Sequence, residues 1–278
     1  MAGEKVIVPS HCVSVPVKIG LLDSGVGGLS VLREVHRLLP GVDLHYFGDS
    51  AWCPYGAKSS EVICARVFQI ADYLLGSGVE MLVIACNSAT IHAVGALRAT
   101  YPLPVVGMEP AVKPAAGQTK SGVIGILATE ASIAGEKFHQ LVNAHASGIR
   151  VITRPCPRFV ELVEAGKLSG PEVDDAVDEA LAPLLQEGAD VLVLGCTHYP
   201  FLREVIESRI PNGVTVVDTG PAVARRVRTV LLEMRPGINP EQGRGEIRVE
   251  TTGSIDLLKR VIPLLLPDLK PSIGFCLL

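Results

Sequence analysis

The segments MLVIACNSAT (residues 81–90) and VLVLGCTHYP (residues 191–200) decide the fold. Each begins with a run of apolar residues, reaches a single cysteine, and continues with residues suited to the start of a helix. An apolar run of this length is typical of a strand buried on both faces of a parallel sheet. Cys86 and Cys196 are therefore each predicted at the carboxyl end of a strand, just before a helix.

The two cysteine segments belong to an internal repeat, because Cys86 and Cys196 lie 110 positions apart and other segments match at a similar offset. These further matches pair residues 18–22 with 123–127 and residues 105–112 with 216–223. Parallel α/β units resemble one another in general, but three matches in one register favour a true repeat over chance. Two similar halves facing each other would form one cleft at the carboxyl ends of both sheets, where open α/β folds bind ligands.

Short apolar runs alternate with longer amphipathic segments along the whole chain. The predicted strands are residues 18–22, 43–47, 81–85, 104–108, 122–127, 150–154, 190–195 and 215–218. The clearest helical patterns cover residues 29–39, 61–78, 138–146 and 171–188. This alternation predicts a doubly wound α/β architecture with mainly parallel sheets and helices on both faces.

The composition excludes several classes of protein. With 278 residues, 48% hydrophobic and 19% charged, the chain is globular and long enough for two domains. A net charge of −4 without a basic cluster argues against a nucleic-acid partner. The start of the chain lacks the apolar core of a signal peptide, and no run is long enough for a membrane span. The chain is therefore expected in the cytoplasm.

Seven cysteines are scattered along the chain without the spacing of a zinc ribbon, which indicates reduced thiols. Cys12, Cys64 and Cys276 are interpreted as small buried hydrophobic residues. Cys53 and Cys156 lie on predicted loops and could line the cleft. A zinc site around Cys196 and His198 is not expected, because a Cys-x-His pair alone falls short of a four-ligand set.

Cys86 and Cys196, which would face each other across the predicted cleft, are the first candidates for catalysis, and the residues after each of them suit helix starts. Asn87 and Ser88 are expected to cap a helix beginning near Thr90, and Pro200 suits the first turn of the next helix. Helix amino ends carry partial positive charge and free N–H groups. They are therefore expected to lower the pKa of both thiols and to hold a substrate carboxylate.

Two further side chains are candidates for acid–base work. His198 is expected to tune Cys196, the alternative being a structural histidine. Asp23 ends the first predicted strand, where it could contact a substrate ammonium, assist a proton transfer or simply cap a helix. The loop that follows it, residues 24–30, fits neither a dinucleotide nor a Walker motif, so a nucleotide is disfavoured.

The ordered motifs of the chain resemble those of glutamate racemases, within the aspartate/glutamate racemase family. The motifs are DSGVGGLSVL (23–32), GDSAWCPYG (48–56), ACNSAT (85–90), CPRFVELVEAG (156–166) and LGCTHYPFL (194–202). The resemblance implies a pseudo-twofold pair of α/β domains with the active site in the cleft between them. The corresponding boundaries are an extension at residues 1–17, a first domain at 18–109 plus 220–278, and a second domain at 110–219.

The same resemblance implies residue roles. The catalytic residues would be Cys86, Cys196, Asp23 and His198. The substrate-binding residues would be Asp23, Ser24, Pro54, Tyr55, Gly56, Asn87, Ser88, Thr129, Glu161, Thr197 and His198. It also implies cofactor-independent interconversion of L- and D-glutamate for peptidoglycan synthesis, a homodimer, and no metal. No lysine stands at a predicted strand end facing the cleft, as a pyridoxal mechanism would require.

Two alternatives stay open from the sequence. A two-cysteine mechanism does not determine which side chain the substrate carries, so the substrate could be aspartate or another amino acid. Some glutamate racemases also bind and inhibit DNA gyrase, although nothing in this sequence supports that partner. Residues 1–17 could serve such an interaction, but their lack of periodicity favours a flexible tail.

Overall fold

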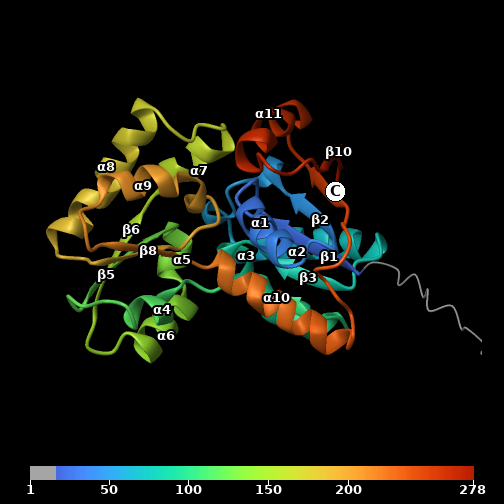
Figure 1. Ribbon diagram of the computed structural model, residues 1–278, viewed down its shortest axis with the longest axis horizontal. Coiled ribbons are helices and arrows are strands. Elements are labelled where there is room, and N and C mark those ends of the chain that lie inside the picture. The colour runs from blue at the N-terminus through green and yellow to red at the C-terminus, as the bar shows by residue number, and fades with distance from the viewer. Residues whose placement is uncertain (1–16) are drawn as a thin grey trace, which may run out of the picture.

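The computed structural model describes residues 17–278, which form two parallel β-sheets flanked by helices (Figure 1). The predicted extension, residues 1–17, therefore lies outside the described residues except for Val17, and so does Cys12. No helix in the described part of the chain is long and apolar enough to cross a membrane. The α/β architecture with parallel sheets predicted from the sequence is confirmed.

The larger sheet has six strands in the spatial order β10-β9-β2-β1-β3-β4. Its strands are β1 (Lys18–Asp23), β2 (Asp43–Gly48), β3 (Met81–Ile84), β4 (Val105–Val106), β9 (Ile247–Thr251) and β10 (Ser272–Phe275). The helices of this half are α1 (Leu29–Leu38), α2 (Ser60–Gly76), α3 (Asn87–Thr100), α10 (Gly220–Met234) and α11 (Ile255–Leu265). Two 3-10 turns, η1 (Ser50–Trp52) and η2 (Tyr55–Ala57), follow β2.

The smaller sheet has four strands in the order β6-β5-β7-β8. Its strands are β5 (Val123–Ala128), β6 (Arg150–Pro155), β7 (Val191–Leu194) and β8 (Thr215–Asp218). The helices here are α4 (Val112–Ala116), α5 (Glu130–Ala134), α6 (Glu136–His145), α7 (Pro157–Glu164), α8 (Pro171–Gln186) and α9 (Arg203–Arg209), with a 3-10 turn η3 (Tyr199–Leu202) before α9.

The internal repeat read from the sequence appears in the topology. Strands β2-β1-β3-β4 of the larger sheet have the same spatial order as β6-β5-β7-β8 of the smaller one. The repeat pairs β1 with β5, β3 with β7 and β4 with β8, which are the same partners in the two sheets. The carboxyl ends of β3 and β7, which precede the two cysteines, therefore occupy equivalent positions. The division into domains at residues 109/110 and 219/220 stays a prediction.

Alternating side chains on the central strands explain why both faces of each sheet are covered. In β3, Met81 and Val83 join the core cluster that contains α1 and α10, whereas Leu82 and Ile84 join the cluster formed with α2 and α3. In β7, Val191 and Val193 pack toward α4 and α6, whereas Leu192 and Leu194 face the side of α7 and α8. This alternation buries a continuous apolar run on two faces at once.

All eight predicted strands are present, but β9 and β10 were not predicted. The segment of β9 contains Arg248 and Glu250, which read as solvent-exposed residues. Glu250 is nevertheless buried, and its carboxylate has three partners there. Nε2 of His45 lies 2.6 Å from its Oε2, and the Tyr73 hydroxyl (2.8 Å) and the Arg248 guanidinium (2.5 Å) donate to it. Those partners come from β2, α2 and β9 itself, so only the tertiary fold makes this strand acceptable.

Candidate active site

Both predicted catalytic cysteines lie at strand ends and line one small cavity. Cys86 stands two residues after β3 and Cys196 two residues after β7, and both are buried. The cavity has a volume of about 20 Å³. It is lined by Ser24, Pro54, Tyr55, Gly56, Cys86, Asn87, Ser88, Thr129, Val160, Cys196, Thr197 and His198. The fold thus brings together residues from six separate stretches of the chain.

The start of α3 differs from the expectation. The helix begins at Asn87, and Cys86 itself occupies the cap position, where its Sγ accepts a hydrogen bond from the Ala89 N–H at 3.5 Å. The expected cap by Asn87 and Ser88 of a helix starting near Thr90 is therefore wrong. The reason is that an extended residue with a side-chain acceptor suits the cap position, and sulfur fills that role here. Pro200 stands in the 3-10 turn η3, and the helix that it was expected to start, α9, begins only at Arg203.

Burial sets the protonation of Cys86. Burial raises the pKa of the Cys86 thiol well above its ordinary value, the nearby carboxyl of Asp23 adds to the rise, and the Ala89 N–H opposes it only in part. The expectation that the helix start would lower the pKa of this thiol is therefore wrong, because desolvation of a thiolate outweighs one N–H donor. Cys86 rests as a thiol, with the Ser24 hydroxyl 3.9 Å from its sulfur.

Asp23 lies beneath the cavity and does not line it. It is fully buried, accepts a hydrogen bond from the Gly28 N–H at 2.5 Å, and receives the Thr197 hydroxyl at 3.4 Å. Burial raises the pKa of Asp23, although the charge of His198 and the Gly28 N–H act against that rise. Asp23 therefore contacts the start of α1, as a helix cap would, and also lies close to Cys86.

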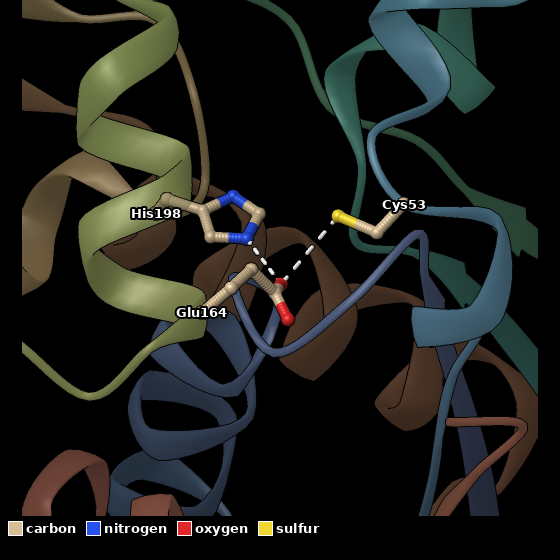
Figure 2. Close-up of side chains that lie close together, drawn as sticks. All are labelled: Cys53, Glu164 and His198. Carbon is tan, nitrogen blue, oxygen red and sulfur yellow. Dashed lines mark hydrogen bonds and ion pairs between the residues drawn. The ribbon is translucent and has the colours of Figure 1, made fainter. Parts of the chain in front are cut away.

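His198 joins the second thiol to a carboxylate. Its Nδ1 lies 3.6 Å from Cys196 Sγ, and its Nε2 lies 2.7 Å from Oε1 of Glu164 (Figure 2). Burial lowers the pKa of His198, but the hydrogen bonds to Cys196, Cys53 and Glu164 outweigh it and raise that pKa well above the usual value. Burial likewise opposes the charge on Glu164, yet the bonds from His198 lower its pKa overall. Both partners are therefore charged near neutral pH.

Two glycines of the 23–32 motif make room for this pair. A Cβ on Gly25 would lie 1.9 Å from Oε1 of Glu164, and a Cβ on Gly27 would lie 2.4 Å from Nδ1 of His198. The loop after β1 can approach the second half of the molecule this closely only with glycine at both positions. The close approach lets the Val26 N–H donate to Oε1 of Glu164 at 2.7 Å.

In the described part of the chain, Asn87 and His36 have buried polar side-chain atoms without a hydrogen-bond partner, and of the two only Asn87 lines the cavity. In the described residues, neither its Nδ2 nor its Oδ1 has a hydrogen-bond partner, although both atoms are buried. Because buried amides are normally hydrogen-bonded, an unpaired one that lines a cavity indicates a ligand position. The other polar groups around the cavity, Ser24, Ser88, Thr129 and Thr197, are hydroxyls that can donate or accept.

A buried polar network holds Tyr55 at the cavity. Its hydroxyl donates to Asp49 at 2.6 Å, and Asp49 also accepts two bonds from Arg66 at 2.8 and 2.9 Å. The Thr252 hydroxyl donates to the same carboxylate at 2.8 Å. The tyrosine is thus fixed by residues from the junction of β2 and η1, from α2 and from the segment after β9.

The remaining candidates fall in different places. Glu161 lies in a neighbouring cavity of about 450 Å³, together with Cys53 and Glu164, and not in the cavity of the two cysteines. Cys156 is buried, with its Sγ 3.5 Å from the Arg154 carbonyl oxygen, and lines neither of these two cavities. Glu164 was missed by the sequence reading, although it stands inside the quoted motif at 156–166. Nothing in the local sequence pattern marks Glu164, the last residue of α7, as a functional residue.

Replacing Glu164 by Gln tests the ion pair with His198. The raised folded-state pKa of His198 stabilises the protein fully below the unfolded value near 6.5, and this contribution disappears as pH rises through the folded value. The lowered pKa of Glu164 adds stability above about 4.5 that is lost as pH falls through its folded value. We expect Glu164→Gln to lose about 1.5–3 kcal/mol near pH 6, measured by urea denaturation, and less at alkaline pH.

The matched control for that experiment is Glu161→Gln, which removes an exposed carboxylate from the same helix. It should change the free energy of unfolding by less than about 0.5 kcal/mol at every pH. A loss in Glu164→Gln that stays constant from pH 6 to pH 9 would contradict a charged pair.

Known proteins resemble this chain over most of its length. The family model described as Asp/Glu/Hydantoin racemase matches residues 19–227. A glutamate racemase from Ectopseudomonas mendocina is 48% identical over 251 residues, covering 90% of this chain and 95% of the relative. One from Herpetosiphon aurantiacus is 48% identical over 235 residues, covering 84% and 92%.

A solved structure has the same fold. The crystal structure of Escherichia coli glutamate racemase, in complex with L-glutamate and the activator UDP-MurNAc-Ala, superposes with a TM-score of 0.83 at 31% identity. The match covers 94% of this chain and 98% of that one. The resemblance noted on the sequence motifs is thereby confirmed. The chain belongs to the Asp/Glu/hydantoin racemase family and is an amino-acid racemase, an isomerase.

Proposed function

We propose that this chain interconverts L- and D-glutamate without a cofactor, with Cys86 and Cys196 as opposed acid and base. The observation that carries the proposal is their shared cavity: two thiols from equivalent strand ends line one space beside an unpaired Asn87 amide. Among the described residues, none of those lining the cavity is a lysine, which a Schiff base would need. The glutamate racemases that resemble the chain support the choice of substrate.

Inversion at the α-carbon needs a proton removed from one face and another delivered to the opposite face. The raised pKa of Cys86 keeps it as a thiol, ready to donate. We assign the thiolate to Cys196, because an imidazolium 3.6 Å from its sulfur favours a negative charge there. The thiolate takes the α-proton while the Cys86 thiol delivers its own to the other face. The roles are then exchanged, as the reverse reaction requires.

In this mechanism Asp23 adjusts the protonation of Cys86, and His198 adjusts that of Cys196. After a turnover Cys86 is the thiolate and Cys196 the thiol, and the starting state returns when solvent takes the Cys196 proton and another proton reaches Cys86 through the nearby Asp23, whose pKa is raised. His198 stabilises the charged form of Cys196 and is itself held by Glu164 through the 2.7 Å contact. Each half of the molecule thus supplies one thiol together with one group that adjusts its proton.

Substrate contacts follow from the unpaired and hydroxyl groups of the cavity. We propose that Asn87, Ser88 and Thr197 stabilise the carboxylate as negative charge spreads onto it from the α-carbon. Ser24, Tyr55 and Thr129 are assigned to the rest of the amino acid. The cavity of about 20 Å³ holds roughly one water molecule, so we propose that its lining residues move apart to admit glutamate.

The cellular role follows from the same proposal. D-Glutamate made by the chain would supply peptidoglycan synthesis. The cytoplasmic location, the homodimer and the domain boundaries stay predictions. So does the absence of a nucleic-acid partner, and nothing in the structure adds support for DNA gyrase.

The test is racemisation by the purified chain in deuterium oxide. Starting from either enantiomer of glutamate, we expect loss of optical rotation with one solvent deuterium entering the α-position of each product molecule. Aspartate and a hydantoin serve as competing substrates and should turn over at least tenfold more slowly. Faster turnover of aspartate would mean that aspartate, and not glutamate, is the substrate. Activity that requires added pyridoxal phosphate would overturn the mechanism.

A further inference from the structure

Three metal-binding side chains converge beside the proposed active site, although they come from different elements. Cys53 follows η1, Glu164 ends α7 and His198 follows β7, and Figure 2 shows the three side chains pointing toward one another. Their Sγ, carboxylate oxygen and ring nitrogen all lie within 4.8 Å of one another. The mechanism above uses Glu164 and His198 but gives Cys53 no role.

The distances suit a zinc ion. Cys53 Sγ lies 3.6 Å from Oε1 of Glu164, and His198 Nε2 lies 2.7 Å from the same oxygen. In tetrahedral zinc sites, sulfur at about 2.3 Å and nitrogen or oxygen at about 2.0 Å place neighbouring ligand atoms roughly 3.3–3.7 Å apart. The sulfur–oxygen separation already fits, the nitrogen–oxygen one must lengthen by about 0.7 Å, and the sulfur and the nitrogen lie within 4.8 Å of each other.

We propose that Cys53, Glu164 and His198 form a binding site for Zn²⁺, and that its occupation inhibits racemisation. One thiolate, one imidazole and one carboxylate are the ligand types that zinc prefers, and three protein ligands leave a fourth position for water. This site differs from the Cys196–His198 pair considered on the sequence. It uses Nε2 of His198, whereas Cys196 faces Nδ1.

The site is accessible from solvent. Cys53 and Glu164 line the neighbouring cavity of about 450 Å³, together with Glu161 and Gly253. An ion can therefore reach the cluster without passing between Cys86 and Cys196. Neither Cys53 nor Glu164 is fully buried, so both side chains have room to adjust on binding.

Inhibition follows from the two nitrogens of one ring, and this part rests on the proposed function. Zinc binds thiolate and neutral imidazole, so binding releases the Cys53 thiol proton and the Nε2 proton of His198 to solvent. The ion takes Nε2 of His198 and the Glu164 carboxylate out of their 2.7 Å contact with each other. The ring that faces Cys196 at 3.6 Å is then held by the ion and no longer by Glu164, so it cannot act on Cys196 as the mechanism requires.

Binding is measured directly, by competition between the metal-free protein and a chromophoric zinc chelator. We expect one Zn²⁺ per chain for the wild type and for Cys64→Ser, which removes a half-buried thiol on α2 as a matched control. Cys53→Ser should weaken binding about a hundredfold or more, because it removes the soft ligand. Cobalt should give a thiolate charge-transfer band in the wild type that Cys53→Ser lacks.

Two further readouts separate the site from other thiols. Zinc should raise the Tm of the wild type and of Cys196→Ser, but not of Cys53→Ser, whose Tm without metal should match the wild type. Zinc should also inhibit the wild type at concentrations that leave Cys53→Ser active. Equal zinc affinity in Cys53→Ser and wild type, or loss of binding in Cys196→Ser alone, would overturn the site. Equal inhibition of both proteins would overturn the inhibitory role.

Failure of this proposal is distinguishable from failure of the proposed function. Zinc affinity, the cobalt band and the Tm shift do not depend on any activity. They would stand even if the chain did not act on glutamate, and glutamate racemisation would stand even if zinc did not bind.

Discussion

Replacing Cys86 or Cys196 by Ser should lower kcat for glutamate racemisation by at least 10³-fold in either direction. General acid–base groups contribute about 10²–10⁴-fold each, and a serine hydroxyl is far too weak an acid to serve at neutral pH. The loss should appear in both variants because each turnover uses both sulfurs. Optical rotation measured from each enantiomer, at matched protein concentration, checks the expectation.

A single base should survive in each of these variants. Elimination of a halide from a β-halogenated glutamate requires only removal of the α-proton, with the electron pair expelling the halide from the neighbouring carbon. We therefore expect Cys86→Ser and Cys196→Ser to retain this elimination for opposite enantiomers. Cys64→Ser, which leaves both cavity thiols intact, should keep full racemisation. Identical behaviour of the two cavity variants toward both enantiomers would contradict opposed bases.

Replacing Arg66 by Met should destabilise the folded state by about 3–5 kcal/mol, because it leaves Asp49 buried without its countercharge. Arg66 is 5% exposed and Asp49 is fully buried, so solvent cannot compensate. The guanidinium also stacks over Trp52 at 5.1 Å and donates to the Leu278 carbonyl oxygen at 3.1 Å. The free energy of unfolding in urea is the measurement.

The control is Arg37→Met, which breaks an exposed pair with Glu34 on α1. A surface pair of that kind contributes about 0–1 kcal/mol, so the two substitutions should separate clearly. The double variant Arg66→Met, Asp49→Asn should be less destabilised than Arg66→Met alone, since no unpaired charge remains. A loss below 1 kcal/mol in Arg66→Met would mean that water reaches the carboxylate after all.

Periodicity and repetition were enough to predict the framework of this protein. Apolar runs located all eight strands of the repeat, and the matching registers around Cys86 and Cys196 predicted one cysteine in each half. These features are local or depend on similarity within the chain, so a single sequence contains them. The motif resemblance added the family and the residue roles, which pattern alone could not provide.

The rest of the site depends on contacts between distant segments. Glu164 reaches His198 across 34 positions, and Cys53 reaches Glu164 across 111, so neither pairing has a periodic signal. The pKa of Cys86 was predicted in the wrong direction because a helix start is visible in the sequence and burial beside Asp23 is not. Strand β9 was missed for the same reason, since Glu250 finds its partners only in the folded chain.

The one-water cavity between the two thiols has a kinetic consequence. A space of about 20 Å³ is too small for glutamate, so under the proposed function the cavity must open to admit the substrate and close around it before the chemistry. Solvent viscosity should then slow turnover even for a good substrate, because product escape reopens the same gap. Compounds that wedge the halves apart would act as inhibitors without imitating the substrate at all.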